Sequence, residues 1–180
     1  MTTIETRRLV LRPMNWEDVD PLLAIFSDPV VMAAFSAEPF GREQMEGWVQ
    51  RNLEHQEQYG YGLFTVILAE SGLVIGDCGI EHMELKGQRV AELGYDLRSD
   101  HWGRGLATEA AIAVRDLAFE TLQLPSLGSL IRRDNHRSQR VAEKVGMHLI
   151  DADVYGDGQY WLFCVDRSDE RLPSGSSSIE

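Results

Sequence analysis

The stretch "DHWGRGLATEAA" (Asp100–Ala111) decides how this chain is interpreted, because it sets two glycines one residue apart in front of a helix-forming run. Before it, "VAELGYDL" (residues 90–97) alternates apolar and polar residues as a strand does. After it, helical spacing predicts a helix from about residue 103 to 122. Its expected buried face consists of Leu106, Ala110, Ala113, Val114, Leu117 and Ala118. A helix start carries unpartnered N–H groups and partial positive charge, so the stretch predicts a phosphate-binding turn.

Two common nucleotide motifs do not fit this turn. The P-loop needs a Lys-Ser/Thr pair after its last glycine, and none is present. The dinucleotide fingerprint needs a third glycine where this chain has Thr108, and it follows the first strand of a βαβ unit rather than several antiparallel strands. From the turn alone, two interpretations stay open: a phosphate site, or glycines that only allow close packing.

Composition indicates one folded domain, expected over residues 1–167, with a polar flexible tail over 168–180. The net charge of −12 disfavours nucleic-acid binding and favours a cationic partner. No apolar run has the length of a membrane span or the form of a secretory signal, so a cytoplasmic protein without a membrane partner is expected. Cys78 and Cys164 lie in apolar segments and are expected to be buried free thiols, and no metal-ligand spacing is present.

The spacing of apolar residues and the positions of Gly and Pro predict a mixed α/β (α+β) sheet of about six to seven strands with about four helices. Asn15 is expected to cap the first helical region, with Asp18 three residues on. Gly146 is expected to end the last helix in a left-handed conformation. The segments around residues 147–155 and 159–167 are expected to pair as a closing hairpin across "GDG".

Four segments in this order resemble the GNAT superfamily of acyl-CoA N-acyltransferases, and more narrowly the branch with the RimJ/RimL ribosomal-protein N-terminal acetyltransferases. They are "ETRRLVLRPMNWEDVDPLLAIFSDPVVM", "GLVIGDCGI", "AELGYDLRSDHWGRGLATEA" and "DNHRSQRVAEKVGM", and the resemblance runs from about residue 6 to 163. It implies a mostly antiparallel sheet with a splayed strand pair at the cofactor site. It also implies transfer of an acetyl group from acetyl-CoA to a primary amine, without a metal. The expected acceptor is a peptide N-terminus or a small amine, and the fold is compatible with a homodimer.

The resemblance implies a set of acetyl-CoA-binding residues. The glycine turn would hold the pyrophosphate, the strand before it would hold the pantetheine arm, and the "NHRS" segment would lie near the thiol. The residues are Tyr95, Leu97, Arg98, Gly103, Arg104, Gly105, Leu106, Ala107, Thr108, Asn135 and Ser138. Asp100 departs from the pattern, since the family often has Gln or Arg there. A local basic cluster is expected beside the phosphates: Arg132, Arg133, Arg137, Arg140 and Lys144.

For catalysis, Glu92 is the first candidate for the general base, and Ser138 for the group that protonates or orients the leaving thiolate. Tyr155 and Tyr160 are alternative acids, whereas Glu109 at the helix start is expected to be structural. Aromatic residues expected to line the acceptor site or the core are Trp16, Phe35, Trp48, Tyr155 and Trp161. An acyl-CoA-binding sensor with the same fold and little turnover is the alternative function.

Overall fold

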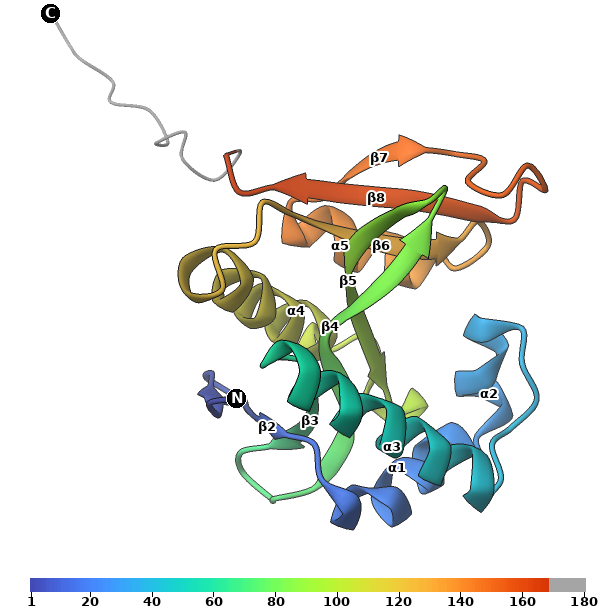
Figure 1. The fold of residues 1–180 in the computed structure, drawn as a ribbon. Helices are drawn as coiled ribbons and strands as arrows, with labels where there is room; N and C mark the ends of the chain where they lie inside the picture. The colour runs from blue at the N-terminus through green and yellow to red at the C-terminus, as the bar shows by residue number, and fades with distance from the viewer. Residues whose placement is uncertain (169–180) are drawn as a thin grey trace, which may run out of the picture.

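One mostly antiparallel sheet runs through the middle of the molecule (Figure 1). The computed structural model describes residues 1–168. Within them, eight strands follow the order β1-β2-β3-β4-β5-β6-β8-β7, and every neighbouring pair is antiparallel except β5 and β6. The strands are β1 (Ile4–Glu5), β2 (Leu9–Pro13), β3 (Leu63–Leu68), β4 (Val74–Leu85), β5 (Gln88–Leu97), β6 (Ser126–Arg132), β7 (His148–Asp151) and β8 (Tyr160–Asp166).

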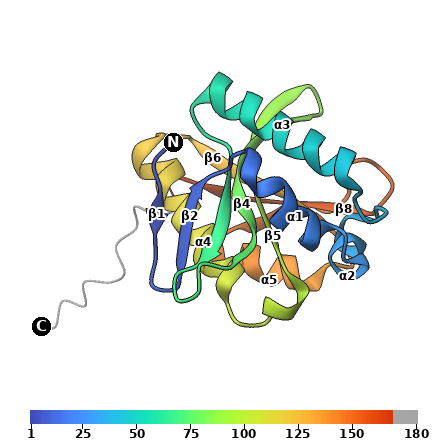
Figure 2. The same cartoon turned by 90° about the horizontal axis from the view of Figure 1, so that it is seen from below.

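Helices cover both faces of the sheet, with α1 and α3 on one face and α4 and α5 on the other (Figure 2). Among the described residues they are α1 (Val19–Phe26), α2 (Pro29–Met32), α3 (Arg42–Tyr59), α4 (Leu106–Asp116) and α5 (His136–Val145). This is the expected α/β architecture with two short additions, the two-residue β1 and the four-residue α2. None of the helices in residues 1–168 is long and apolar enough to cross a membrane.

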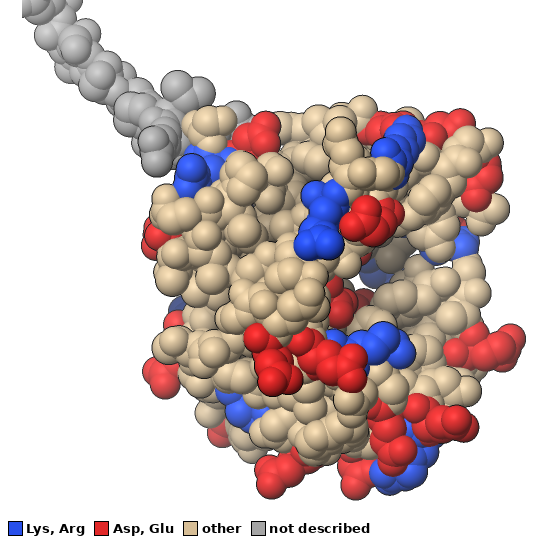
Figure 3. Space-filling view, viewed as in Figure 1, with Lys and Arg blue, Asp and Glu red and all other residues tan. Residues whose placement is uncertain are grey.

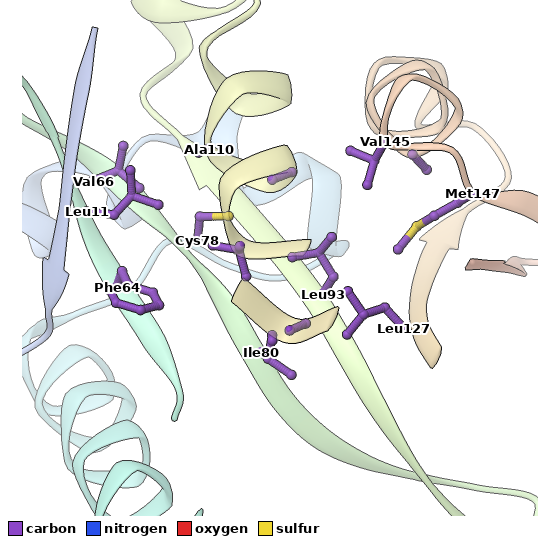
Figure 4. Close-up of a cluster of buried hydrophobic side chains, with 14 of the residues drawn as sticks. Leu11, Phe64, Val66, Cys78, Ile80, Leu93, Ala110, Leu127, Val145 and Met147 are labelled. Carbon is purple, nitrogen blue, oxygen red and sulfur yellow. The ribbon is translucent and has the colours of Figure 1, made fainter. Parts of the chain in front are cut away.

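The larger core lies between the sheet and the helices α4 and α5 (Figure 4). Cys78 and Ile80 of β4 and Leu93 of β5 point toward Ala110 of α4 and Val145 of α5. A second core joins α1, α2 and α3 on the other face. The two cores make the sheet a rigid platform whose central strands carry side chains toward both layers.

The structure corrects three details of the sequence interpretation. The helix after the glycine turn begins at Leu106 rather than near residue 103, because Gly103 and Gly105 both have φ of 75° and cannot continue a helix. Ala113 and Leu117 of its predicted buried face are half-buried, while the neighbouring Ala111 and Phe119 are buried. Both cysteines are free, but only Cys78 is buried, and Cys164 is half-buried. The predicted tail lies outside the described residues except for its first residue.

Asp18 fastens the first helical region to the sheet. The expected cap is confirmed: the Asn15 side chain accepts a hydrogen bond from the Glu17 N–H, and the Asn15 N–H donates to Asp18. The Asp18 carboxylate, fully buried, also pairs with Arg12 at 2.6 Å and accepts from the Thr65 hydroxyl at 2.7 Å. Burial alone would raise the pKa of Asp18, but these hydrogen bonds outweigh it and lower the pKa below its ordinary value.

We expect Asp18→Ala to reduce the free energy of unfolding by about 3 kcal/mol at neutral pH, because it leaves the Arg12 guanidinium and two other donors without their acceptor. Urea denaturation followed by circular dichroism measures the change. Asp20→Ala is the matched control, since Asp20 lies two residues farther on, in the first turn of α1, with its carboxylate largely exposed. It should change stability by less than about 0.5 kcal/mol. Equal losses in the two variants would contradict the assignment.

Candidate functional site

A cleft of about 790 Å³ opens where the end of β5 meets the first turns of α4 and α5 and the short helix α2. Figure 3 shows a hollow between the half of the molecule that carries β6 to β8 and the half that carries α1 to α3. Of the predicted binding residues, nine line the cleft: Tyr95, Leu97, Gly103, Gly105, Leu106, Ala107, Thr108, Asn135 and Ser138. Segments far apart in the sequence therefore meet at one site.

The glycine turn forms the anion-binding wall of this cleft. Gly105 is the N-cap of α4, so the N–H groups of Leu106, Ala107 and Thr108 have no acceptor inside the helix. A Cβ placed on Gly103 would project into space with no heavy atom within 4 Å. Backbone donors at a helix start, approachable without a side chain in the way, fit a pyrophosphate group.

Three of the five predicted basic residues line the same cleft: Arg137, Arg140 and Lys144. The Arg137 guanidinium lies 4.3 Å from the ring centroid of Trp102, which fixes its position by a cation–π contact. Arg132 instead pairs with Asp134 at 2.6 Å. The cleft thus joins helix-start amides with side-chain cations, as a ligand carrying several phosphates would require.

Asp100, the unexpected anion of the turn, does not line the cleft. Its carboxylate accepts two hydrogen bonds from Arg98, each 3.1 Å long, and lies 2.8 Å from Nδ1 of His101. These bonds, Arg98 first, hold the pKa of Asp100 well below its ordinary value. Arg98 and Arg104 are likewise not among the lining residues, and Arg104 donates to the Asp100 carbonyl. Asp100 is therefore neutralised locally, and binding roles for the two arginines stay predictions.

Tyr95 and Ser138 form a reciprocal pair on one wall. The Tyr95 hydroxyl donates to the Ser138 carbonyl at 2.8 Å and accepts from the Ser138 hydroxyl at 3.1 Å. Asn135 caps α5, since its side-chain oxygen accepts from the Ser138 N–H at 3.2 Å. The start of α5 is thereby held against β5, and the Ser138 hydroxyl has a fixed neighbour at the cleft.

β5 and β6 are paired as parallel strands over a very short distance and then separate. Their register has one pair, Glu92 opposite Gly128. Beyond it, side chains replace the backbone ladder: the Ser129 hydroxyl donates to the Leu93 carbonyl at 2.6 Å, and the Leu130 N–H donates to the Glu92 carboxylate at 3.2 Å. Burial raises the pKa of Glu92 to about 7, although the Leu130 N–H opposes the shift. A carboxylate with this pKa can accept a proton near neutral pH.

The sequence interpretation missed a second carboxylate, Asp96, which lines the cleft itself. Burial, with the nearby charges of Glu92 and Glu81, raises the pKa of Asp96 to about 7. Directly across the strand pair lies Asp77, which is fully buried and whose pKa is raised well above its ordinary value by burial and by Asp96. The two-residue period of a strand could have revealed these residues in the sequence. It places Asp77 and Glu81 on one face of their strand, and Glu92 and Asp96 on one face of theirs.

Other candidates have mainly structural surroundings. Glu109 accepts hydrogen bonds from the Thr6 hydroxyl and from Arg8, in agreement with the structural role expected for it. Of the aromatic residues expected at the acceptor site or in the core, Phe35, Trp48 and Trp161 pack against the two cores, whereas Trp16 and Tyr155 are exposed. Among residues 1–168, no group of three or more His, Cys, Asp or Glu side chains is placed to hold a metal ion.

The helix α2 and the residues that follow it form the opposite side of the cleft, which we call the lip. The lining residues of the lip are Val30, Val31, Ala33 and Ala34. Asp28 caps this helix by accepting from the Val30 N–H at 2.9 Å. The other oxygen of Asp28 accepts from the Ser99 hydroxyl at 2.6 Å. Since Ser99 begins the turn that leads to the glycines, one carboxylate ties the lip to the anion-binding wall.

Comparison with known proteins gives consistent results. The family model described as "Acetyltransferase (GNAT) domain" matches residues 8–148. The uncharacterized protein YkkB of Bacillus subtilis is 38% identical over 148 residues, which are 82% of this chain and 86% of YkkB. An acetyltransferase structure from Agrobacterium tumefaciens is 33% identical with a TM-score of 0.80, covering 92% of this chain and 94% of that one. RimL, a ribosomal-protein alpha-N-acetyltransferase solved with coenzyme A, shares the fold at 16% identity, with a TM-score of 0.72 over 92% of this chain and 98% of RimL.

The raised pKa values of Glu92 and Asp96 predict an unusual pH dependence of stability. Their pKa values are higher in the folded chain than in the unfolded one, so the stability they contribute is complete below the unfolded values near 4. It is lost as the pH rises through about 7, by up to about 1.4 kcal/mol per pH unit for each proton released. We therefore expect the free energy of unfolding to fall between pH 5 and pH 8.

Urea denaturation at several pH values in that range measures this slope, and Asp96→Asn should flatten it. Glu84→Gln is the control, because Glu84 is exposed on the same strand pair and should keep the wild-type slope. Stability that stays constant or rises from pH 6 to pH 8 would contradict the assignment.

Proposed function

Because the chain belongs to the acetyltransferase (GNAT) domain family, we propose that it is an acetyl-CoA-dependent N-acetyltransferase acting on a primary amine. A peptide N-terminus, as in the RimJ/RimL branch, and a small amine are the two acceptor types. We further propose that residues 1–167 form the single catalytic domain. One observation supports the proposal above the others: Asp96, with a pKa of about 7, lines the same cleft as the amide-lined, basic anion site. Glu92, with a similar pKa, is not among the lining residues and lies farther along β5, where β5 and β6 separate.

The residues of the cleft fit coenzyme A. The first-turn amides of α4 suit its pyrophosphate, and Arg137, Arg140 and Lys144 suit its remaining phosphate charge. The separated edge of β5 leaves backbone groups of Tyr95 to Leu97 at the cleft, where an extended arm can pair as a strand would. When bound, acetyl-CoA supplies an acetyl thioester as the group to be transferred.

We assign Glu92 the role of general base. At neutral pH a carboxylate with a pKa of about 7 can take a proton from an ammonium group, so that the neutral amine attacks the thioester carbonyl directly. An N–C amide bond forms, the C–S bond breaks, and the proton lost by the amine balances the one gained by the thiolate. Ser138, held by Tyr95, is the residue proposed to orient or protonate that sulfur. No covalent intermediate with the protein is required.

Ligand-induced stabilisation, followed by turnover, tests the proposed function. Acetyl-CoA and CoA should both raise the melting temperature, whereas ATP should not. Release of free thiol is then measured with a panel of peptides and small amines. Stabilisation by ATP alone would exclude the acetyltransferase assignment. Binding of CoA without an increase in thiol release by any acceptor would indicate an acyl-CoA sensor instead.

We expect Gly103→Asn to weaken binding of CoA about tenfold or more, because a side chain over the turn prevents the phosphate from reaching the amides. Asparagine tolerates the left-handed conformation, so the fold should remain intact. Gly72→Asn is the matched control: Gly72 has φ of 71°, is also in open space, and lies in the turn between β3 and β4. Isothermal titration calorimetry compares the two. Equal affinities for CoA would show that the phosphates bind elsewhere.

We expect Glu92→Gln to lower kcat about 100-fold while leaving the affinity for CoA unchanged, because only proton transfer is removed. In the wild type, the rate should rise with pH through about 7 as Glu92 ionises, and this limb should disappear in the variant. Initial rates between pH 5.5 and pH 9 measure both effects. Glu84→Gln should behave as wild type. An unchanged pH profile in Glu92→Gln would remove Glu92 as the base.

A further inference from the structure

Four carboxylates occupy one face of the strand pair β4–β5. The register sets Asp77 opposite Asp96 and Glu81 opposite Glu92, with Gly79 and Gly94 between the two pairs. Directly opposite residues have Cβ atoms about 4.5 to 5.5 Å apart. The electrostatic influence of these groups on one another agrees with this placement, since Asp77, Asp96 and Glu92 are each affected by at least one other member. We call these four residues the carboxylate face.

The protein itself does little to neutralise the carboxylate face. In the described part of the chain, none of its members forms an ion pair; the donors are the Trp48 indole, at 3.3 Å from Asp77, and the Leu130 N–H on Glu92. Four carboxyl groups on one face, each with its pKa raised by burial, reduce the stability of the fold when they ionise, so their presence needs another explanation.

Among the described residues, two basic side chains, His55 and Arg51, act electrostatically on this face, both on Glu81. His55 of α3 affects Glu81, but its Nε2 accepts from the His82 N–H and its Nδ1 lies 2.8 Å from the Tyr61 carbonyl. That pattern is the neutral tautomer, with Nδ1 as donor. Arg51 is exposed and near Glu81, with its guanidinium 5.8 Å from the Trp48 ring centroid.

Two further observations indicate a ligand at the carboxylate face. Asp77 is fully buried, yet its Oδ1 has no hydrogen-bond partner among the described residues, which is rare for a buried carboxylate. Beside it, a Cβ added to Gly94 would meet no heavy atom within 4 Å, although Gly94 lies at the centre of a sheet. The face therefore combines an unused acceptor on β4 with open space over β5, whereas the backbone of Gly62 and Leu63 covers Gly79 on β4.

We propose, resting on the acetyltransferase function above, that the acceptor is a small linear amine with a second ammonium group, which the carboxylate face holds. One amino group is acetylated while the other remains a cation against the carboxylates. The two pairs lie four residues apart, or about 13 Å along the strand. An extended diamine can therefore contact one pair with its reacting end and approach the other with its charged end. The reacting end lies at Glu81 and the proposed base Glu92, and the charged end lies at Asp77 and Asp96, of which Asp96 also lines the cleft.

A series of acceptors that differ only at the far end tests this inference. Hexamethylenediamine, n-hexylamine and ε-aminocaproate present a cation, a neutral methyl group and an anion at the same chain length. We expect kcat/KM to fall in that order, with the diamine at least about tenfold better than the monoamine. Octamethylenediamine tests the span. A peptide with a free N-terminus is included as the other acceptor type.

The outcomes separate this inference from the proposed function. If peptides or monoamines are acetylated as well as the diamine, the carboxylate face does not select a second cation and the inference is overturned, while the acetyltransferase function stands. If no acceptor releases thiol although CoA binds, the proposed function itself fails. A diamine preference that falls with rising salt supports an electrostatic origin.

Variants of the buried residue give a sharper test. Asp77→Asn keeps the shape and an acceptor for the Trp48 indole, and it should bring the diamine-to-monoamine ratio of kcat/KM close to one. Glu57→Gln, on the exposed side of α3, should keep the wild-type ratio. A ratio unchanged by Asp77→Asn, or changed equally by both variants, would contradict the assignment.

Calorimetry gives a readout that does not depend on turnover. A second ammonium group favours the ionised carboxylates, so binding of hexamethylenediamine at pH 7 should release protons. Titrations in two buffers of different ionisation enthalpy measure that number. Asp96→Asn should reduce it, and n-hexylamine should release fewer protons than the diamine. Equal proton release by the two amines would overturn the inference.

Discussion

The separation of β5 and β6 after one parallel contact is the constraint on which the rest of this structure depends. Gly128 allows the contact, because a Cβ there would stand 3.0 Å from Val90. Two side chains, Ser129 and Glu92, then satisfy backbone groups that a continuous ladder would have used. The separation of the two strands leaves the end of β5, the start of α4 and the start of α5 around one cleft.

Side chains of opposite charge lie on different sides of the separated strands, although the chain as a whole is acidic. The net charge is −12, yet the side formed by α4 and α5 presents Arg137, Arg140 and Lys144 together with helix-start amides. The opposite side presents the carboxylate face. Both signs of charge lie along the hollow in Figure 3. A basic site and an acidic face on one molecule match the two ligands of opposite charge that the proposed function requires.

Much of this arrangement could be predicted from local sequence. Alternation gave the long strands, Gly146 ended α5 as expected, and Asn15 with Asp18 marked the first cap. The carboxylate face could not be found in that way, because its two strands become opposite only through the register of a hairpin. Nor does the sequence show that Asp100 is neutralised by its neighbours. The two-residue β1 and the four-residue α2 are too short to carry a periodic signal.

The hydrogen bond between Asp28 and Ser99 links two walls of the cleft that come from distant parts of the chain. It joins the lip formed by α2 to the turn that precedes the glycines, so a displacement of one acts on the other. A contact that immobilises the turn therefore also restrains the lip, through one shared carboxylate and without a change of fold.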